Sequence, residues 1–330
     1  MAVAHSLNAR GDPRLLAPLA SHLRWVTDRA KARDDEMAAA LCNQLGYYLK
    51  RTGDYQTARP FYKRALAIRE KVLGPNHPDT AVSLNNLACL LQAMGDYQAA
   101  CPYFERALAI CKKVLGPEHS DTAASLNNLA GLFYVIGDYP AARPLYDRAL
   151  AIYEKVLGPD NSDTANSLNN LGGLLQAMGD LPAARPLYDR ALAIREKVLG
   201  PDHPDTAVSL NNLGYLLREM GDYQAARPLY ERALAICEKV LGLEHPNTTN
   251  VRLGLALAAL GQGDHDIARP HLQLLLASSE NRLGAEHAQT RFIQGLLARA
   301  NVYTVARSSC PAAWLGWVVP VTRWIRGWLA

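Results

Sequence analysis

The sequence has little of several features that mark whole classes of protein. Its 330 residues carry a formal net charge of only +4, and no run of Lys and Arg is interleaved with aromatics, which argues against a nucleic-acid partner. No uninterrupted apolar run reaches about 18 residues, so no membrane span is expected. The N-terminus lacks a cationic start followed by an apolar run, which argues against a signal peptide. We therefore expect a cytoplasmic protein.

Paired cysteines and catalytic motifs are missing as well. The six cysteines lie at irregular spacing and form no CxxC pair, which indicates buried free thiols in a reducing compartment. The chain has no GxxxxGK[ST], GxSxG or HExxH sequence, and nothing pairs a nucleophile with a base. We therefore predict no enzymatic activity, no cofactor and no metal site.

What the chain has in abundance is repetition. The pentapeptide Ser-Leu-Asn-Asn-Leu recurs every 42 residues, beginning at Ser83, Ser125, Ser167 and Ser209. Gly-Asp pairs keep the same interval, beginning with Gly53 and Asp54. Between them apolar residues lie three and four positions apart, which is the helical period, and no segment alternates with period two. The sequence therefore predicts an all-α chain of stacked helix pairs.

Glycine, proline and aspartate mark the ends of these helices. Gly95 follows the first helix of a pair, where a left-handed cap favours glycine, and Asp96 is expected to cap the second helix. Gly74 and Pro75 end the second helix. Asp79 is then expected to be the N-cap of the next pair, and we expect the same of its counterparts Asp121, Asp163 and Asp205.

Histidines recur in the loops between pairs. They are His77, His119, His203, His245 and His287, with Asn161 in the fourth loop. Stacked helices place successive loops about 10 Å apart, whereas zinc binds its nitrogen ligands at about 2 Å. We therefore interpret these histidines as part of the loop structure and not as metal ligands.

The repeats divide the chain into three parts. Residues 1–37 form a partial N-terminal repeat, which is either a worn cap or a sign that the chain derives from a longer protein. Residues 38–305 form a solenoid of about six to seven helix pairs, and residues 306–330 form a tail that breaks the register. The tail holds Trp314, Trp317, Trp324 and Trp328 together with Arg323 and Arg326. It is open whether this tail caps the last repeat, binds a membrane surface or partner, or is a disordered or non-native extension.

The repeat unit itself resembles a known family. Gly-Asp-Tyr-Gln-Ala-Ala-Arg-Pro-Leu-Tyr-Glu-Arg-Ala-Leu-Ala-Ile at 221–236, preceded by Ser-Leu-Asn-Asn-Leu, resembles the tetratricopeptide repeat (TPR), in the 42-residue form found in kinesin light chains and many bacterial proteins. The second unit meets the family pattern with Leu87, Ala88, Leu91, Gly95, Tyr97, Ala100, Phe104 and Ala107. The resemblance implies a right-handed superhelical α-solenoid whose first helices line a concave groove, and a non-catalytic scaffold that binds proteins or peptides there.

The second Asn of each pentapeptide is the candidate ligand contact. In peptide-binding members of the family an Asn at this position holds the ligand backbone, and a carboxamide offers both a donor and an acceptor for that purpose. The resemblance implies this role for Asn86, Asn128, Asn170 and Asn212. Gln44 and Gly254 take this position in the first and sixth units, so both ends of the series are in question. The alternative is that an Asn pairs between adjacent helices, and we favour that role for the preceding residues Asn85, Asn127, Asn169 and Asn211.

Other positions on the same helix face give the expected groove its character. One turn after the Asn pair the residues are mostly small, and Gln92 and Gln176 follow one turn later. Positive charge lies near both ends, so a ligand with separated acidic residues would fit. Besides the four Asn residues, we assign Lys50, Arg51, Tyr134, Tyr215 and Arg218 to the peptide-binding face.

Two further functions stay open at this point. The partial first repeat is compatible with a sensor or regulatory arm of a larger NTPase-type signalling protein. The Trp-rich tail is compatible with a peripheral membrane adaptor, in which residues 309–330 contact the lipid surface.

Overall fold

A computed structural model describes residues 21, 24–25, 27–29 and 33–309, with side chains up to Asn301. The regular secondary structure of this described part consists of α-helices, which confirms the predicted all-α class. The chain divides into two compact units, Met1–Leu174 and Leu175–Ala330, and each is considered by itself. Most of the partial repeat predicted for 1–37 and the tail from residue 310 onward lie outside the described residues.

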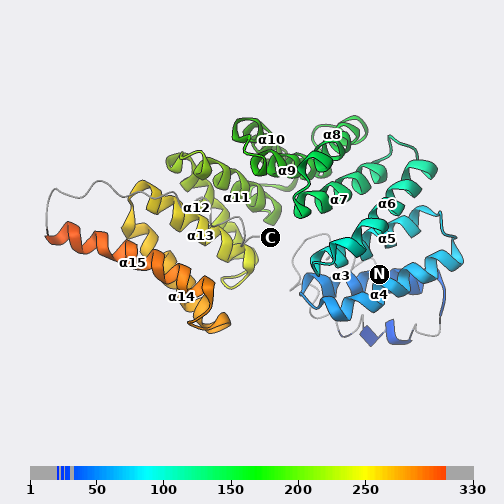
Figure 1. Cartoon of the computed structure of the whole chain (residues 1–330), viewed down its shortest axis with the longest axis horizontal. Helices are drawn as coiled ribbons and strands as arrows, with labels where there is room; N and C mark the ends of the chain where they lie inside the picture. The colour runs from blue at the N-terminus through cyan, green and yellow to red at the C-terminus, as the bar shows by residue number, and fades with distance from the viewer. Residues whose placement is uncertain (1–20, 22–23, 26, 30–32, 310–330) are drawn as a thin grey trace. The chain divides into compact units, whose positions relative to one another are not determined.

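The first unit is built from consecutive helix pairs, and each helix packs against the next (Figure 1). These helices are α3 (Glu36–Arg51), α4 (Tyr55–Val72), α5 (Pro78–Ala93), α6 (Tyr97–Val114), α7 (Ser120–Ile136) and α8 (Tyr139–Val156). Helix α9 (Ser162–Ala177) begins in this unit and continues past its end.

The second unit continues the same pattern. Its helices are α10 (Leu181–Leu199), α11 (Pro204–Glu219), α12 (Tyr223–Val240), α13 (Pro246–Gln262), α14 (His265–Leu283) and α15 (Ala288–Ser309). The first and second helix of each repeat are called helix A and helix B.

The two helices of a repeat pack closely around one aromatic side chain. Gly46 on α3 lies against Tyr62 on α4, and a Cβ atom at Gly46 would be 3.0 Å from the Tyr62 ring. Gly214 on α11 lies in the same way against Tyr230 on α12, at 3.2 Å. Both rings are almost completely buried. A small residue on helix A therefore sets how near helix B can approach.

The predicted turn within each repeat is confirmed. Gly95 follows helix α5 with a φ of 79°, the left-handed region that favours glycine. The carboxylate of Asp96 then accepts a hydrogen bond from the backbone N–H of Ala99 at 3.2 Å, so Asp96 is the N-cap of α6.

The expectation that Asp79 is the N-cap of α5 is wrong. The helix begins at Pro78, and its N-cap is His77, whose Nδ1 accepts the backbone N–H of Asp79 at 3.2 Å. Proline suits the first helical position because its fixed φ is helical and its missing N–H would have no partner there. Asp79 lies in the first turn, where the helix dipole favours a negative charge. The counterparts Asp121, Asp163 and Asp205 also lie in first turns.

The same capping bond explains the repeated histidines. The Nδ1 atoms of His119, His203, His245 and His287 accept the N–H of the residue two positions later at 3.1–3.2 Å. In the fourth loop the Oδ1 of Asn161 accepts the equivalent bond at 2.8 Å. The interpretation of these residues as loop structure is confirmed. Among the residues that the structure describes, no three metal-ligating side chains come together.

Five cysteines belong to the described part, and all are free thiols, as predicted. Cys42, Cys111 and Cys237 are buried. Burial raises the pKa of the Cys237 thiol to about 11, which holds it in the neutral, unreactive form at pH 7. None of the helices in the described part is long and apolar enough to cross a membrane.

The capping role of the histidines is testable at His119. His119→Ala removes the acceptor at the start of α7, and we expect a loss of about 0.5–2 kcal/mol in the free energy of unfolding. His119→Asn should retain most of the stability, because Asn161 makes the same bond in the next loop. Urea unfolding of the two variants beside the unchanged chain measures both effects. Equal destabilisation by Ala and Asn would contradict the assignment.

Candidate functional site

Each helix A leaves one narrow face uncovered. On α5 the residues Leu84, Leu87 and Leu91 are buried, whereas Asn86 and Cys89 are only partly buried. The uncovered residues lie three and four positions apart, so they form one stripe along the helix. We call this stripe, defined by the positions of Asn86, Cys89 and Gln92 and their counterparts in the other A helices, the Asn face.

On α5 the first Asn of the pentapeptide links neighbouring repeats. The Nδ2 of Asn85 on α5 donates to the Oγ of Ser125 on α7 at 3.0 Å, and Asn43 on α3 donates to Ser83 on α5 at 3.3 Å. The role favoured for Asn85 is therefore confirmed. Asn169 differs, because it is buried and donates to the backbone oxygen of Ala165 in its own helix at 3.1 Å.

The second Asn lies at the surface of its helix in each repeat. Asn86 and Asn128 are partly buried in the first unit, and Asn212 is partly buried in the second. Asn170 is exposed, and its Nδ2 donates to the Oδ1 of Asn127 at 3.2 Å. Asn170 thus takes part in a link between repeats while it stays accessible. Peptide binding by these four residues stays a prediction.

Gly254 marks the end of the Asn series for a steric reason. A Cβ atom at this position on α13 would lie 2.3 Å from Cε1 of Tyr230 on α12. Real Cβ contacts are never this short, so the buried Tyr230 ring occupies the place where an Asn side chain would begin. The series therefore stops at Asn212.

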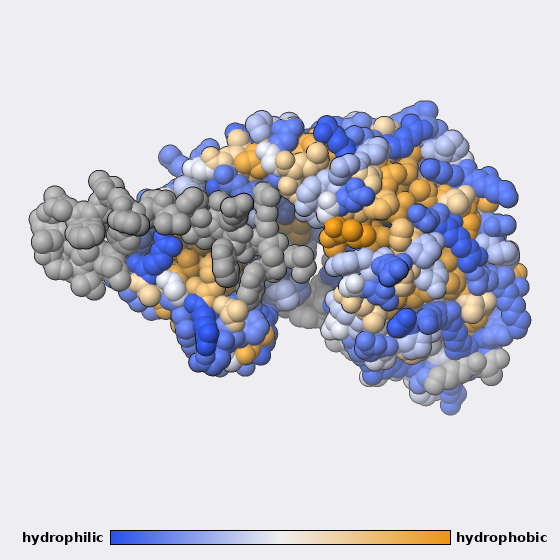
Figure 2. All heavy atoms as spheres, viewed as in Figure 1, coloured by the Kyte–Doolittle hydropathy of each residue, from blue (hydrophilic) through white to orange (hydrophobic). Residues whose placement is uncertain are grey.

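In the first unit, three further predicted residues lie at the C-terminal ends of A helices. Lys50 and Arg51 form the last turn of α3, and Arg51 is exposed. Tyr134, in the last two turns of α7, is 36% exposed, and its ring centroid lies 5.9 Å from that of Tyr139. Hydrophobic residues also reach the surface of this unit among hydrophilic ones (Figure 2).

In the second unit, Tyr215 and Arg218 lie together on α11. The guanidinium carbon of Arg218 is 4.6 Å from the centroid of the Tyr215 ring, which is cation–π geometry. This contact holds Arg218 over the ring. An anion that binds Arg218 would therefore meet an aromatic side chain as well.

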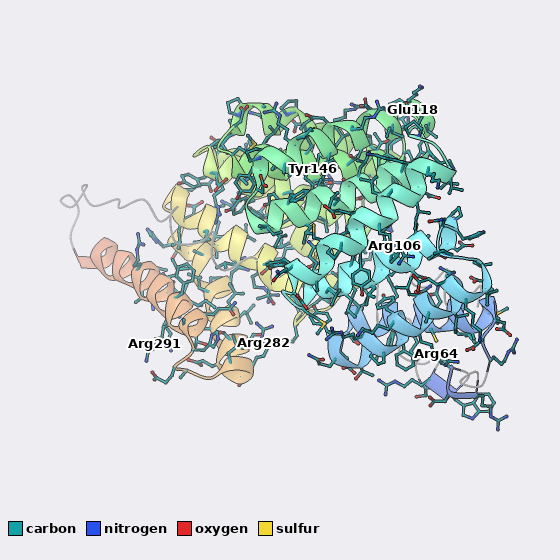
Figure 3. The ribbon with its side chains drawn as sticks, turned by 45° about the vertical axis from the view of Figure 1, so that its right-hand side comes forward. Arg64, Arg106, Glu118, Tyr146, Arg282 and Arg291 are labelled. Atoms are coloured by element: carbon teal, nitrogen blue, oxygen red, sulfur yellow. The ribbon has the colours of Figure 1, made fainter. Side chains whose placement is uncertain are left out.

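Gly131, one of the small residues on the Asn face, lies beside a tyrosine of helix B. A Cβ atom at Gly131 on α7 would lie 3.5 Å from the hydroxyl of Tyr146, which is labelled on α8 in Figure 3. Burial raises the pKa of this phenol above its ordinary value, so it stays neutral. Part of the room expected for ligand side chains therefore borders a buried helix-B tyrosine.

Gln176 does not lie where the sequence placed it. It is only 7% exposed, its Nε2 donates to Oε2 of Glu219 at 2.7 Å, and its Oε1 accepts from the Tyr188 hydroxyl at 3.0 Å. The amide links three helices of the second unit instead of facing a ligand. No feature of the repeat pattern distinguishes Gln176 from Gln92, which is why the sequence missed this role.

Buried arginines are a second feature that the repeat pattern did not indicate. Arg195 on α10 is 6% exposed, and its Nη1 donates to the backbone oxygen of Asp205 at 2.8 Å and to Oγ of Ser209 at 2.9 Å. Burial lowers the pKa of its guanidinium. The pentapeptide Ser is therefore an acceptor inside the stack, for an arginine here and for Asn85 at Ser125.

The tetratricopeptide repeat family matches five overlapping stretches of the chain, residues 36–100, 88–155, 121–194, 163–239 and 209–281. A putative kinesin light chain from Podosopora anserina, with nearly identical TPR-like repeats, is 29% identical, covering 63% of this chain and 98% of that chain with a TM-score of 0.54. BtubC (BKLC) from P. vanneervenii is 26% identical, covering 74% of this chain and 94% of its own with a TM-score of 0.54.

A third solved structure has the same fold at lower identity. It is a Rap protein complexed with Competence and Sporulation Factor, 19% identical, covering 85% of this chain and 80% of that chain with a TM-score of 0.60. No curated protein matches the chain. The family matches follow one another through α3 to α14, and the likeness to the first two structures includes their repeat type. The chain therefore belongs to the tetratricopeptide repeat family, and its repeats are of the kinesin-light-chain-like kind.

Proposed function

We propose that the protein is a non-catalytic scaffold that binds proteins or extended peptides on the Asn face. The observation that carries this proposal is the division of work between Asn85 and Asn86 on α5, although on α9 the second Asn, Asn170, makes the link between repeats. Asn85 is used between repeats, whereas Asn86, one residue later, lies at the helix surface. Because the backbone bonds of α5 are made within the helix, the Asn86 carboxamide has no capping task.

The spacing of the carboxamides suits an extended ligand. Asn86, Asn128 and Asn170 lie on successive A helices of the first unit, and packed helices are about 8–10 Å apart. An extended chain rises about 3.3 Å per residue, so one carboxamide would meet about every third ligand residue. Each could donate to a ligand C=O and accept from an N–H without selecting its side chain. A preformed helical surface also lowers the ordering cost of binding on the protein side.

The charges next to the Asn face favour acidic ligand residues. Lys50 and Arg51 supply two cations at the end of α3 in the first unit, and Arg218 supplies one in the second. The Rap structure was solved with Competence and Sporulation Factor bound, and its low identity to this chain supports the fold alone. We infer the acidic character of the ligand from the side chains of this protein.

The Asn face is tested with peptides selected by the intact protein from a random display library. In Asn86→Ala/Asn128→Ala, each lost carboxamide should cost about 0.5–1.5 kcal/mol, so the affinity should fall about fivefold or more. Asn85→Ala is the matched control. It should lower the unfolding midpoint, because it breaks the bond to Ser125, and leave the affinity nearly unchanged. Unaltered affinity in the double variant, measured by calorimetry, would refute the Asn face as the binding surface.

The charge preference gives a separate test. Lys50→Ala, Arg51→Ala and Arg218→Ala together should weaken selected acidic peptides and reduce the dependence of Kd on salt, because screening acts on the charges removed. Fluorescence anisotropy at two salt concentrations measures both quantities, with neutral peptides from the same library as the control. If the triple variant binds acidic and neutral peptides as the unchanged protein does, the ligand charge is not read by these side chains.

A further inference from the structure

The outer side of the stack carries a polar contact that recurs from repeat to repeat. An arginine on helix B reaches back to the loop before its own repeat. Nη2 of Arg106 on α6 donates to the backbone oxygen of Pro75 at 3.2 Å, and Nη2 of Arg64 on α4 donates to that of Arg33 at 3.1 Å. Figure 3 labels both arginines on their successive B helices.

In other repeats, an acidic residue of the equivalent loop adds an ion pair to this contact. Glu118, at the loop between α6 and α7, is paired with both Arg148 and Lys155 of α8, and the Lys155 Nζ lies 3.1 Å from its Oε2. In the second unit Lys239 pairs with Asp202 in the same register at 3.2 Å. In these repeats, cations of helix B therefore bind the preceding loop.

The last full repeat has lost these cations. The 42-residue interval places Leu274 of α14 at the position of Arg148 and Asn281 at the position of Lys155. The loop acid is kept as Glu244, and Leu243 replaces the proline that stands at Pro75. The charged contact between loop and helix B has become two leucines beside one carboxylate.

The structure brings these residues to one place on the second unit. Oγ of Ser278 on α14 lies 2.5 Å from Oε2 of Glu244, so this part of α14 borders the loop. Leu274 is one helical turn before Ser278, and Leu243 directly precedes Glu244. The side chains of Leu243 and Leu274 are 58% and 56% exposed, the highest values among the large hydrophobic residues of the described part. We call Leu243, Glu244 and Leu274 the terminal patch.

We propose that the terminal patch docks the C-terminal segment of the same chain, residues 310–330. The tryptophans of this segment would cover Leu243 and Leu274, and Arg323 or Arg326 would replace the cations that Glu244 has lost. The chemistry of the segment is the complement of the patch, since it joins large apolar side chains to arginines and has no Asp or Glu. This docking is independent of ligand binding on the Asn face.

The segment is long enough to reach the patch. It begins at the end of α15, which packs against α14 after a short loop. The 36 residues from Leu274 to Ser309 include 22 in α15, so the end of this helix lies about 33 Å from its start. The 21 following residues can span about 30 Å as a helix and about 70 Å when extended. Attachment to the same chain also gives the segment a high effective concentration at the patch.

The competing position for the segment is over α15, as the second helix of a seventh repeat. Ala298 there is the counterpart of Gly214, which faces Tyr230 of helix B in its own repeat. Helix α15, however, continues to Ser309, past Val305, where earlier repeats have the turn glycine. A helix B therefore cannot begin in register. Ala298 is exposed, so a substitution there tests this alternative without disturbing the core.

The test uses the full chain with Trp25→Phe, so that the remaining four tryptophans all report on the segment. Acrylamide quenching of tryptophan fluorescence is measured for this Trp25→Phe chain and for the same chain with Leu243→Pro/Leu274→Arg. The double substitution restores the residues of earlier repeats, so the variant should fold. We expect the quenching constant to rise about twofold or more when the apolar cover is lost, and trypsin to cleave faster after Arg323 and Arg326. Ala298→Arg is the matched control. It should change neither the quenching constant nor the rate of trypsin cleavage after Arg323 and Arg326.

Three results would overturn the docking. The first is equal quenching with and without the double substitution. The second is release of the tryptophans by Ala298→Arg, which would place the segment over α15. The third is protection that disappears on dilution, or that arises only with phosphatidylcholine and phosphatidylserine vesicles, because the cover would then be a second copy or a membrane. Light scattering at the same concentrations gives the mass of the species.

Discussion

The close approach of the two helices within a repeat governs the rest of the structure. Gly46 and Gly214 let the rings of Tyr62 and Tyr230 lie against the backbone of helix A, and the rings are thereby removed from water. This contact fixes which side of helix A is buried. The Asn face borders this contact, since Gly131 lies beside the Tyr146 hydroxyl and Gln176 accepts from Tyr188. Large aromatic side chains of this kind bury much apolar area, which favours the packing.

Stacking between repeats adds polar contacts to an apolar core that consecutive repeats of the first unit share. It uses hydrogen bonds inside the stack, such as Asn85 to Ser125 and Arg195 to Ser209, and cations outside it, such as Lys155 to Glu118. The inner bonds are shielded from water, whereas the exposed ion pairs each contribute little. The outer contacts can therefore be exchanged at little cost in stability. In the last full repeat they are replaced by the terminal patch, which leaves apolar surface for another segment to cover.

Most of the fold followed from the sequence because the 42-residue interval repeats the same local signals. The helix class, the left-handed glycines and the Asp96 cap needed only local chemistry. The helix start was misplaced by two residues at Asp79, since proline at the first helical position lets His77 act as the cap. The burial of Gln176 was not predictable, because it depends on contacts with Tyr188 and Glu219 from other helices. Gln92 has the same side chain at the equivalent position, so the sequence alone does not distinguish the two.

The sixth repeat separates what the fold needs from what binding would need. There Val251 replaces the pentapeptide Ser and Gly254 replaces the second Asn, yet α13 still packs against both α12 and α14. Stacking therefore does not require a carboxamide at this position. Asn170 shows that the same side chain can add a link to a neighbouring repeat. Asn86 and Asn128 are partly buried, and the residue before each already takes part in a bond between repeats: Asn85 donates one, and Asn127 accepts one. Asn86 and Asn128 therefore present groups that can both donate and accept hydrogen bonds, at a place where the sixth repeat stacks without them, and this is the chemistry that the proposed peptide binding would use.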